Sequence, residues 1–317
     1  MRIEDAEKYL DIAVLIPCYN EEATIKKVVN DFQLGIPSAL VYVYNNASTD
    51  GTVEIATKAG AIVRTEPNKG KGNVMRRMFS DIEADIYIIV DGDDTYEASK
   101  CLEMVNKLID SNLDMVIASR KTENSEGEYR WGHVFGNRML TRSVSLIFGH
   151  GFTDMLSGYR VMSHRFVKSF PIASKGFEIE TEITIHALQI GASCAEIETL
   201  YDSRPEGSES KLNTFKDGFK ILWMILILFK EGKPFQFFGL LSLFFFIISV
   251  VLSISIFSTY IETGMVPKIP TAVLSTGLMI LSFFSLIAGV ILDSLSRSRL
   301  EVKRANYLSY KSPKVKL

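Results

Sequence analysis

The chain of 317 residues has little cysteine, almost no net charge and no leader-like N-terminus. Its three cysteines, Cys18, Cys101 and Cys194, are few and widely spaced, which excludes a disulfide-stapled scaffold. They form no CxxC or CxxH pair, so a zinc site of that type is excluded. The formal charge of −2 and the lack of a basic N-terminal arm exclude nucleic acid as the main partner. Residues 1–11 are too charged for a signal peptide.

Apolar residues are instead concentrated near the C-terminus. Residues 234–261 contain no charged side chain and include seven of the 20 phenylalanines, and residues 269–292 form a second charge-free run. About 20 apolar residues in a helix cross a hydrocarbon core, so we expect transmembrane helices at about 234–260 and 269–292. Neither run has the polar stripe of a buried helix in a water-soluble protein. The chain is therefore predicted to be an integral membrane protein with a two-helix hairpin at 234–292.

The flanks of this hairpin predict its orientation. Residues 293–317 are expected to form a basic tail, and the positive-inside rule places that tail in the cytoplasm. Two spans then place the large N-terminal domain, residues 1–214, in the cytoplasm as well. Residues 215–233 contain nine consecutive apolar residues, which are too few to cross a bilayer. They predict an amphipathic interfacial helix, with a core helix as the alternative.

Short apolar runs alternate with helical patterns in the N-terminal domain. This alternation predicts an α/β fold with a parallel, doubly wound, Rossmann-like sheet. Ligands of such sheets bind beyond the carboxyl ends of the strands, so the segments after the strands are the candidate site. The strands are expected at residues 12–16, 40–44, 61–64, 86–90, 115–118 and 193–199.

An acidic turn, Asp91-Gly92-Asp93-Asp94, directly follows the most apolar predicted strand. Carboxylates at a strand end are costly unless a cation neutralises them. Divalent metals with hard oxygen ligands, Mg²⁺ or Mn²⁺, are suitable partners, and Mg²⁺ typically also binds substrate phosphate. Asp91 and Asp93 are therefore predicted to bind a divalent metal. The alternative is a turn that only caps the next helix.

Two further segments combine glycines with cations. Residues 67–72, PNKGKG, precede a predicted helix whose N-terminus favours an anion, and Lys71 adds positive charge. Residues 204–211, RPEGSESK, have the donors of a loop that closes over phosphate. Together with the acidic turn they predict a bound diphosphate. A plain surface turn is the alternative for residues 67–72.

Six motifs occur in order along the chain. As a set they resemble glycosyltransferase family 2, whose members have the GT-A fold. The last two motifs and the hairpin resemble the polyprenyl-phosphate sugar transferases of the dolichyl-phosphate mannose or glucose synthase type. The resemblance covers residues 12–292. The motifs are LIPCYNEE (15–22), NNASTDGT (45–52), NKGKG (68–72), DGDD (91–94), SGYR (157–160) and GSESK (207–211).

The resemblance implies roles for individual residues. The metal ligands would be Asp91 and Asp93. The implied catalytic residues are Asp93, Asp154, Arg120, Arg160 and Lys211. The acceptor phosphate is expected at Arg120, Arg138, Ser157 and Arg160. The nucleotide-sugar is expected at Pro17, Tyr19, Glu21, Asn45, Asn46, Asp50, Lys71, Asp91, Gly92, Arg204 and Ser210.

The implied reaction moves a sugar from a nucleotide-diphosphate sugar, a UDP-sugar rather than a GDP-sugar, to undecaprenyl or dolichyl phosphate, with inversion at the anomeric carbon. A phosphate is already an anionic nucleophile, so Asp154 is either a base or a turn residue. Glu178, Glu180 and Glu182 could face the sugar, although their spacing puts neighbours on different helix faces.

Three alternatives stay open at this point. The acceptor could be a hydroxyl of a lipid-linked saccharide or of a cell-surface polysaccharide, which would require a base. A non-catalytic membrane scaffold that binds nucleotide sugars belongs to a different class of function. Small serine and glycine positions in the hairpin would also allow a homo-oligomer.

Overall fold

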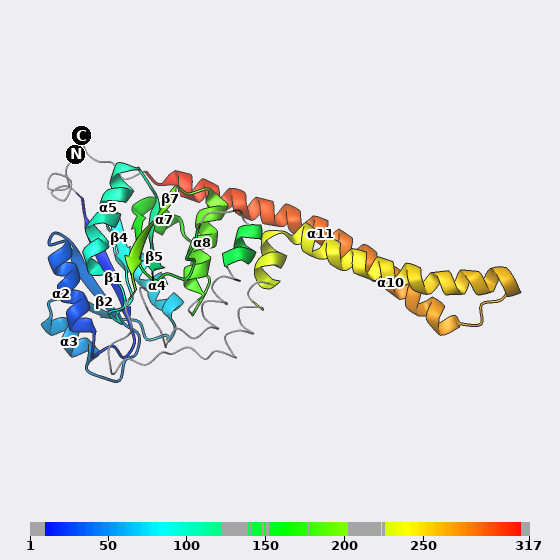
Figure 1. Ribbon diagram of the computed structural model, residues 1–317, viewed down its shortest axis with the longest axis horizontal. Coiled ribbons are helices and arrows are strands. Elements are labelled where there is room, and N and C mark those ends of the chain that lie inside the picture. Colours follow the sequence, from blue (N-terminus) through cyan, green and yellow to red (C-terminus); the bar gives the residue numbers. More distant parts are fainter. Residues whose placement is uncertain are drawn as a thin grey trace. The chain divides into compact units, whose positions relative to one another are not determined.

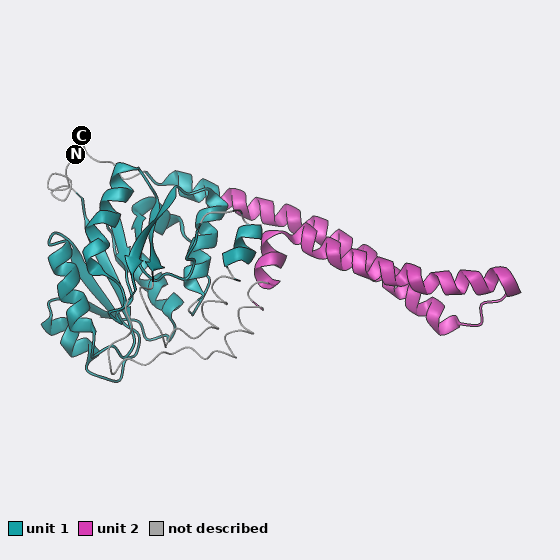
Figure 2. Cartoon of the chain, viewed as in Figure 1, with its two compact units in different colours: residues 1–218, 303–317 teal, residues 219–302 magenta. Residues whose placement is uncertain are grey.

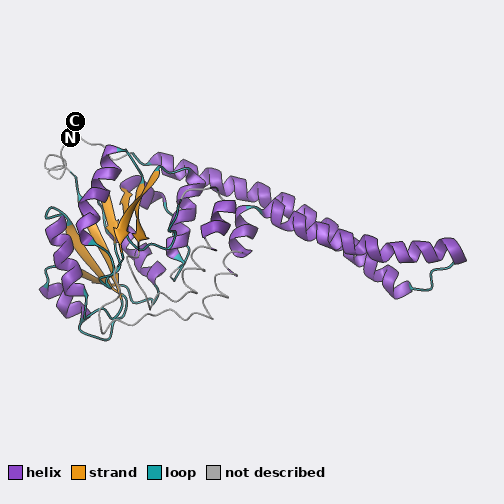
Figure 3. Cartoon of the chain, in the orientation of Figure 1, coloured by secondary structure: helices purple, strands orange, loops and turns teal. Residues whose placement is uncertain are grey.

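The computed structural model describes residues 10–121, 139, 141–147, 149, 152–176, 178–201, 223 and 226–311 (Figure 1). The chain divides into two compact units (Figure 2). The first comprises residues 1–218 and 303–317, and the second comprises residues 219–302. Every strand of the sheet lies in the first unit, and the described part of the second is helical apart from a bend at Lys233 and the connection between its two long helices (Figure 3).

A seven-stranded sheet of order β3-β2-β1-β4-β6-β5-β7 forms the centre of the first unit. The predicted doubly wound α/β sheet is confirmed, but the expectation that all its strands are parallel is wrong. β6 runs antiparallel to both of its neighbours, β4 and β5. It was not predicted because a strand of only four residues, which begins at the last residue of the SGYR motif, is too short to show an apolar pattern of its own. The strands are β1 (Ile12–Cys18), β2 (Leu40–Asn45), β3 (Ile62–Thr65), β4 (Ile86–Ile89), β5 (Met115–Lys121), β6 (Arg160–Ser163) and β7 (Cys194–Leu200).

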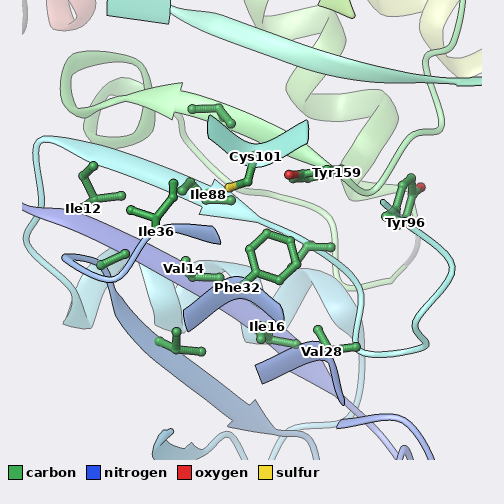
Figure 4. Close-up of a cluster of buried hydrophobic side chains, with 14 of the residues drawn as sticks. Ile12, Val14, Ile16, Val28, Phe32, Ile36, Ile88, Tyr96, Cys101 and Tyr159 are labelled. Atoms are coloured by element: carbon green, nitrogen blue, oxygen red, sulfur yellow. The ribbon is translucent and has the colours of Figure 1, made fainter. Parts of the chain in front are cut away.

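Helices cover both faces of this sheet. Alternate residues of β1 contribute to two separate cores: Ile12, Val14 and Ile16 to one (Figure 4), and Ala13 and Leu15 to the other. Helices α2, α3 and α5 pack on the first core, and α4, α7 and α8 pack on the second. Their bounds are α2 (Ile25–Gly35), α3 (Thr52–Lys58), α4 (Lys71–Asp81), η1 (Ala98–Lys100), α5 (Cys101–Asp110), α7 (His164–Ser169) and α8 (Ile179–Ile190).

Helix α2 shows why these segments dock on the sheet. Its buried side chains, Ile25, Val28, Val29 and Phe32, follow a spacing of three and four residues and so form one apolar stripe. The Phe32 ring meets the Tyr159 ring edge-on, with centroids 5.8 Å apart (Figure 4). Burial of a large apolar side chain contributes about 1.5–3 kcal/mol. The stripe therefore holds α2 behind β1 and leaves the loop before α2 at the carboxyl edge of the sheet.

The second unit contains α10 (Pro234–Thr263) and most of α11 (Ile269–Ser309), both long and apolar enough to cross a membrane. Serines line the contact between the two helices. The hydroxyl oxygens of Ser242 and Ser282 are 3.1 Å apart, and those of Ser249 and Ser275 are 3.2 Å apart. A Cβ added to Gly289 would lie 3.1 Å from Cβ of Phe238. Small residues seven positions apart thus allow the backbones to approach closely.

Helix α11 continues beyond the predicted second span, and residues 303–311 belong to the first unit. There the hydroxyl of Tyr307 donates to Asp114 at 2.7 Å, and the Arg165 guanidinium lies 4.9 Å from the centroid of the Tyr307 ring. Part of the predicted basic tail is therefore helical and packs on the sheet domain. The predicted interfacial helix at 215–233 falls mostly outside the described residues; residues 223 and 226–232 are helical.

Candidate active site

The loops that follow β1 and β2 are tied together at the carboxyl edge of the sheet. The Asn20 side chain accepts the Thr49 N–H at 2.8 Å, and Ser48 Oγ accepts the Asn20 N–H at 3.0 Å. Asp50 accepts the hydroxyl and the N–H of Thr52. Burial opposes ionisation of Asp50, but these hydrogen bonds outweigh it and lower its pKa. The expected nucleotide-binding loops therefore form one preorganised edge.

Asn45 and Asn46 extend this edge to the NKGKG segment. Both side chains are buried, at 7% exposure each. Asn46 Nδ2 donates to the carbonyls of Glu66 and Asn68, and its Oδ1 accepts the Gly70 N–H at 2.7 Å. Asn46 thus joins the loop after β2 to the loop after β3, a role that needs an amide with both a donor and an acceptor.

The acidic turn after β4 is closely packed. Asp93 is 5% exposed, and its Oδ1 accepts the Thr95 hydroxyl at 2.7 Å. A Cβ at Gly92 would lie 2.8 Å from Cys18 Sγ, so only glycine fits between β1 and this turn. A Cβ at Gly158 would lie 2.2 Å from Asp91 Oδ2, which places the turn before β6 directly against this carboxylate. The turn is therefore held on both sides.

The chemistry of this turn fits a hard divalent cation. Asp91 and Asp93 offer carboxylate oxygens, the ligand type that Mg²⁺ and Mn²⁺ prefer. Among the described residues no group of three or more His, Cys, Asp or Glu side chains is arranged to hold a metal ion. Mg²⁺ usually binds through one or two carboxylates and completes its shell with water and substrate phosphate. A metal here would consequently bind together with a phosphate ligand.

Lys71 lies at the N-terminal end of α4 beside the same turn. Its Nζ is 2.5 Å from Asp91 Oδ1 and 2.5 Å from Glu180 Oε1. Burial disfavours the charged lysine, but the two carboxylates outweigh it and raise the pKa of Lys71. The NKGKG segment thus places the charged ammonium group of Lys71 beside the acidic turn.

Arg120 and Asp154 form a bidentate ion pair at the end of β5. Nε and Nη2 of Arg120 donate to the two carboxylate oxygens of Asp154 at 2.6 and 2.8 Å. The Arg120 guanidinium lies 5.3 Å from the centroid of the Tyr201 ring. Asp154 is 5% exposed. A carboxylate with both oxygens engaged by a guanidinium is a poor proton acceptor and a good holder of that cation.

Arg160 lies on β6 in the interior of the first unit, at 1% exposure. Its guanidinium donates to the carbonyls of Ser157, Met155 and Glu180 and to the hydroxyl of Thr184. Burial lowers its pKa. Arg160 Nη1 also points to the sulfur of Met115 at 3.7 Å. A guanidinium has five N–H groups, and these buried contacts use all of them. The arrangement therefore does not support the predicted acceptor-phosphate role.

The remaining predicted residues divide into three groups. Ser157 is fully buried, and its hydroxyl accepts the N–H of Tyr159, so it too is turned inward. Three lie at the ordered edge: Pro17 in β1, Tyr19 with the Lys69 ammonium 5.2 Å from its ring centroid, and Glu21, whose N–H donates to Thr52. The predictions for Arg138, Arg204, Ser210 and Lys211 fall outside the described residues.

The structure also assigns the three glutamates at the start of α8. Glu180 contacts Lys71, and Glu182 accepts the N–H groups of Ala173 and Ser174, both at 2.9 Å, whereas Glu178 is exposed. The sequence allowed only some of the three to face the sugar, and it did not reveal the Lys71–Glu180 pair. The signal that was present is their i, i+2 spacing, which sends neighbours in different directions.

Comparison with known proteins places the chain in a family. Glycosyl transferase family 2 matches residues 13–170. Protein RfbJ of Shigella flexneri is 57% identical over 123 residues, 39% of this chain and 95% of that protein. Glycosyltransferase AglJ of Haloferax volcanii is 34% identical over 229 residues, 72% of this chain and 75% of the relative. The dolichyl-phosphate hexose transferase of the same organism is 27% identical, covering 66% of this chain and 89% of the relative.

A solved structure gives the fold. Glucosyl-3-phosphoglycerate synthase from Mycobacterium tuberculosis, in complex with Mn²⁺, UDP-glucose and phosphoglyceric acid, superposes with a TM-score of 0.57 and 19% identity, over 72% of this chain and 81% of that one. The predicted GT-A fold is thereby confirmed. The chain is a glycosyltransferase, and it belongs to glycosyl transferase family 2.

Proposed function

We propose that this enzyme transfers a sugar from a nucleotide-diphosphate sugar, a UDP-sugar in preference to a GDP-sugar, to the phosphate of a polyprenyl lipid. The reaction inverts the anomeric carbon and depends on Mg²⁺ or Mn²⁺ at Asp91 and Asp93. The name of the dolichyl-phosphate hexose transferase and the two long apolar helices support a lipid acceptor. The UDP and Mn²⁺ complexes of the structural neighbour support the donor and the metal.

The observation that carries the choice of acceptor is the Arg120–Asp154 pair. Transfer to a hydroxyl needs a base to take the proton, and the carboxylate predicted for that task has both oxygens on Arg120. Transfer to a phosphate needs no base and does need an oriented cation. We assign Arg120 to the acceptor phosphate and Asp154 to positioning Arg120.

The bonds of this reaction balance without a proton transfer. A phosphate oxygen of the lipid forms a bond to the anomeric carbon, while the bond from that carbon to the nucleoside diphosphate breaks. The leaving diphosphate takes the electron pair. A bound metal supplies positive charge for this departing group. Lys71 adds a second charge from the start of α4, where the helix N-terminus also favours anions.

The orientation in the membrane forms part of the proposal. Residues 303–311 contact the sheet domain: Lys303 Nζ donates to Gln189 at 2.8 Å, and Tyr307 donates to Asp114. The end of α11 and the sheet domain therefore share one side of any membrane that the hairpin crosses. Arg297, Arg299 and Lys303 directly follow the second apolar run, so this side is the cytoplasm.

A donor and acceptor screen tests the reaction. Full-length protein in detergent is incubated with UDP-glucose, UDP-N-acetylglucosamine or GDP-mannose and with undecaprenyl or dolichyl phosphate, and products are identified by mass spectrometry. We expect a polyprenyl-phosphate sugar from a UDP-sugar and none after removal of metal with EDTA. Product only from a lipid-linked saccharide would instead establish the hydroxyl acceptor, and donor binding without any turnover would establish the scaffold.

Asp154→Asn separates the two possible roles of this carboxylate. As a positioning residue it should raise the KM for the lipid phosphate about tenfold and leave the pH profile of kcat unchanged, because a neutral amide holds Arg120 less firmly. As a base, its loss would lower kcat by about 10²–10⁴ and remove an ionisation from the pH profile.

A further inference from the structure

The acidic turn already holds a cation that belongs to the chain. Lys71 Nζ lies between Asp91 and Glu180, 2.5 Å from an oxygen of each. The three side chains come from α4, the turn after β4 and the start of α8, so the tertiary fold brings them together. The Lys71 side chain is 11% exposed and that of Glu180 is 9% exposed. Ion pairs this well shielded from water are screened little by salt.

Close backbone packing fixes Lys71 in this position. A Cβ at Gly70 would lie 2.1 Å from the carbonyl oxygen of Lys175, and one at Gly72 would lie 2.3 Å from that of Ser174. The Glu182 carboxylate in turn accepts a hydrogen bond from the N–H of Ser174. The NKGKG backbone therefore rests directly on the segment before α8, and Lys71 extends from it towards Asp91.

Asp91 cannot move away from Lys71 on its other side. The backbone of Gly158 lies so close to this carboxylate that a Cβ there would be 2.2 Å from Asp91 Oδ2. One oxygen of Asp91 faces Lys71 and the other faces Gly158. A divalent metal that used Asp91 would compete with the lysine for the first oxygen.

We propose that Lys71 is a counter-ion of Asp91 that opposes metal binding until a nucleoside diphosphate is present, and that Glu180 shares the lysine charge and so limits its hold on Asp91. The diphosphate provides a new anionic partner for the lysine and further ligands for the metal. Metal and nucleotide therefore bind cooperatively, while each alone binds weakly. This inference rests on the proposed metal-dependent function.

Manganese binding without turnover tests the inference. Free Mn²⁺ is measured by electron paramagnetic resonance during titration of full-length protein in detergent, with and without UDP. In the wild-type protein we expect UDP to tighten Mn²⁺ binding about tenfold or more. Lys71→Met should tighten Mn²⁺ binding about tenfold in the absence of UDP, because a competing positive charge is removed. The same variant should weaken UDP binding, since its cation is lost.

Matched variants separate local competition from general charge effects. Lys69→Met removes the same charge from the same loop and should change Mn²⁺ affinity about twofold or less. Lys71→Arg keeps the charge and should behave like the wild type. Glu180→Gln leaves Lys71 with Asp91 as its carboxylate partner, so it should weaken Mn²⁺ binding, opposite in sign to Lys71→Met. The exposed Glu178→Gln is its control.

Each outcome decides one question. If Lys71→Met and Glu180→Gln both weaken Mn²⁺ binding while the melting temperature falls, the triad is structural and the inference is wrong. If wild type binds Mn²⁺ with UDP but Lys71→Met leaves the affinity for Mn²⁺ alone unchanged, the inference is wrong and the proposed function stands. If no variant binds Mn²⁺ even with UDP, the metal-dependent function fails as well.

Discussion

The sheet domain and the helical hairpin bury opposite kinds of side chain. In the sheet domain Val14 and Ile88 are completely buried. In the hairpin the buried side chains include Ser249 at 1% exposure, whereas Phe244 and Phe283 are 58% and 59% exposed. Large apolar side chains thus form the interior of the sheet domain and the exterior of the hairpin.

This inversion is the pattern expected of two regions that fold against different solvents. In water, apolar burial drives packing, at about 25 cal/mol per Å² of buried apolar surface. In a hydrocarbon surrounding, apolar side chains gain nothing by leaving the solvent, so helices associate through close contact of small residues and hydrogen bonds. The proposed membrane location therefore predicts that matched substitutions have different effects in the two regions.

The largest effect is expected from the buried cation of the sheet domain. Arg160→Met should lower the free energy of unfolding by about 3–5 kcal/mol, because it leaves buried carbonyls without donors. Arg77→Met, which removes an exposed ion pair with Asp81, should leave the free energy of unfolding nearly unchanged, because solvent screens this pair. Thermal unfolding in detergent measures both. A stable Arg160→Met protein that had lost only its use of lipid phosphate would restore the acceptor role.

The next effect tests the inversion directly. Ile88→Ala should destabilise the sheet domain by about 2–5 kcal/mol, because it removes buried methyl groups and leaves a cavity. Ile287→Ala, at a position 53% exposed on α11, should change stability by less than about 0.5 kcal/mol. Denaturant titrations compare the two variants. Equal losses would mean that the outer face of α11 is covered by protein.

A smaller effect is expected at the serine contact of the hairpin. Ser282→Leu inserts a large side chain between α10 and α11 and should cost about 1–3 kcal/mol, most of it from overpacking. Thr276→Leu on the exposed side of α11 is the control and should be nearly neutral. Unfolding by SDS in mixed micelles compares them. If Ser282→Leu were neutral too, the two helices would not depend on this contact.

The smallest effect is expected in the dependence of stability on pH. The pKa of Asp50 is lowered in the folded chain, so its stabilisation is present above the unfolded value of about 3.9 and is lost as the pH falls through the folded value. The difference in melting temperature between wild type and Asp50→Asn should be constant above about pH 5 and should shrink below about pH 4. A difference that grew in acid would reverse the assigned direction.

The sequence predicted the fold better than it predicted the roles of charged residues. The strands at 12–16, 40–44 and 86–90 were visible because apolar runs between polar turns depend on local composition. The acidic turn was found for the same reason, since three of its four residues are aspartates. The burial of Arg160 was not visible, because the sequence of a four-residue strand does not show what covers it.

Long-range charge pairing was the other feature that local pattern did not reveal. Lys71 and Glu180 are more than one hundred positions apart and meet only because α4 and α8 pack on the same face of the sheet. Tyr307 and Asp114 are likewise joined by the return of α11 to the first unit. Side chains this distant in sequence carry no shared local signal.

The sequence by itself determined the α/β class, the two apolar helices and the location of the candidate site after the strands, because all three follow from the periodicity of apolar residues. Tertiary structure alone decided which charges are available to a ligand. The antiparallel strand β6 turns Arg160 into the core, and the pairing of β5 with its neighbours places Arg120 beside Asp154 at the edge. The energy of a charge depends on its burial and its partners, and both are properties of the folded chain.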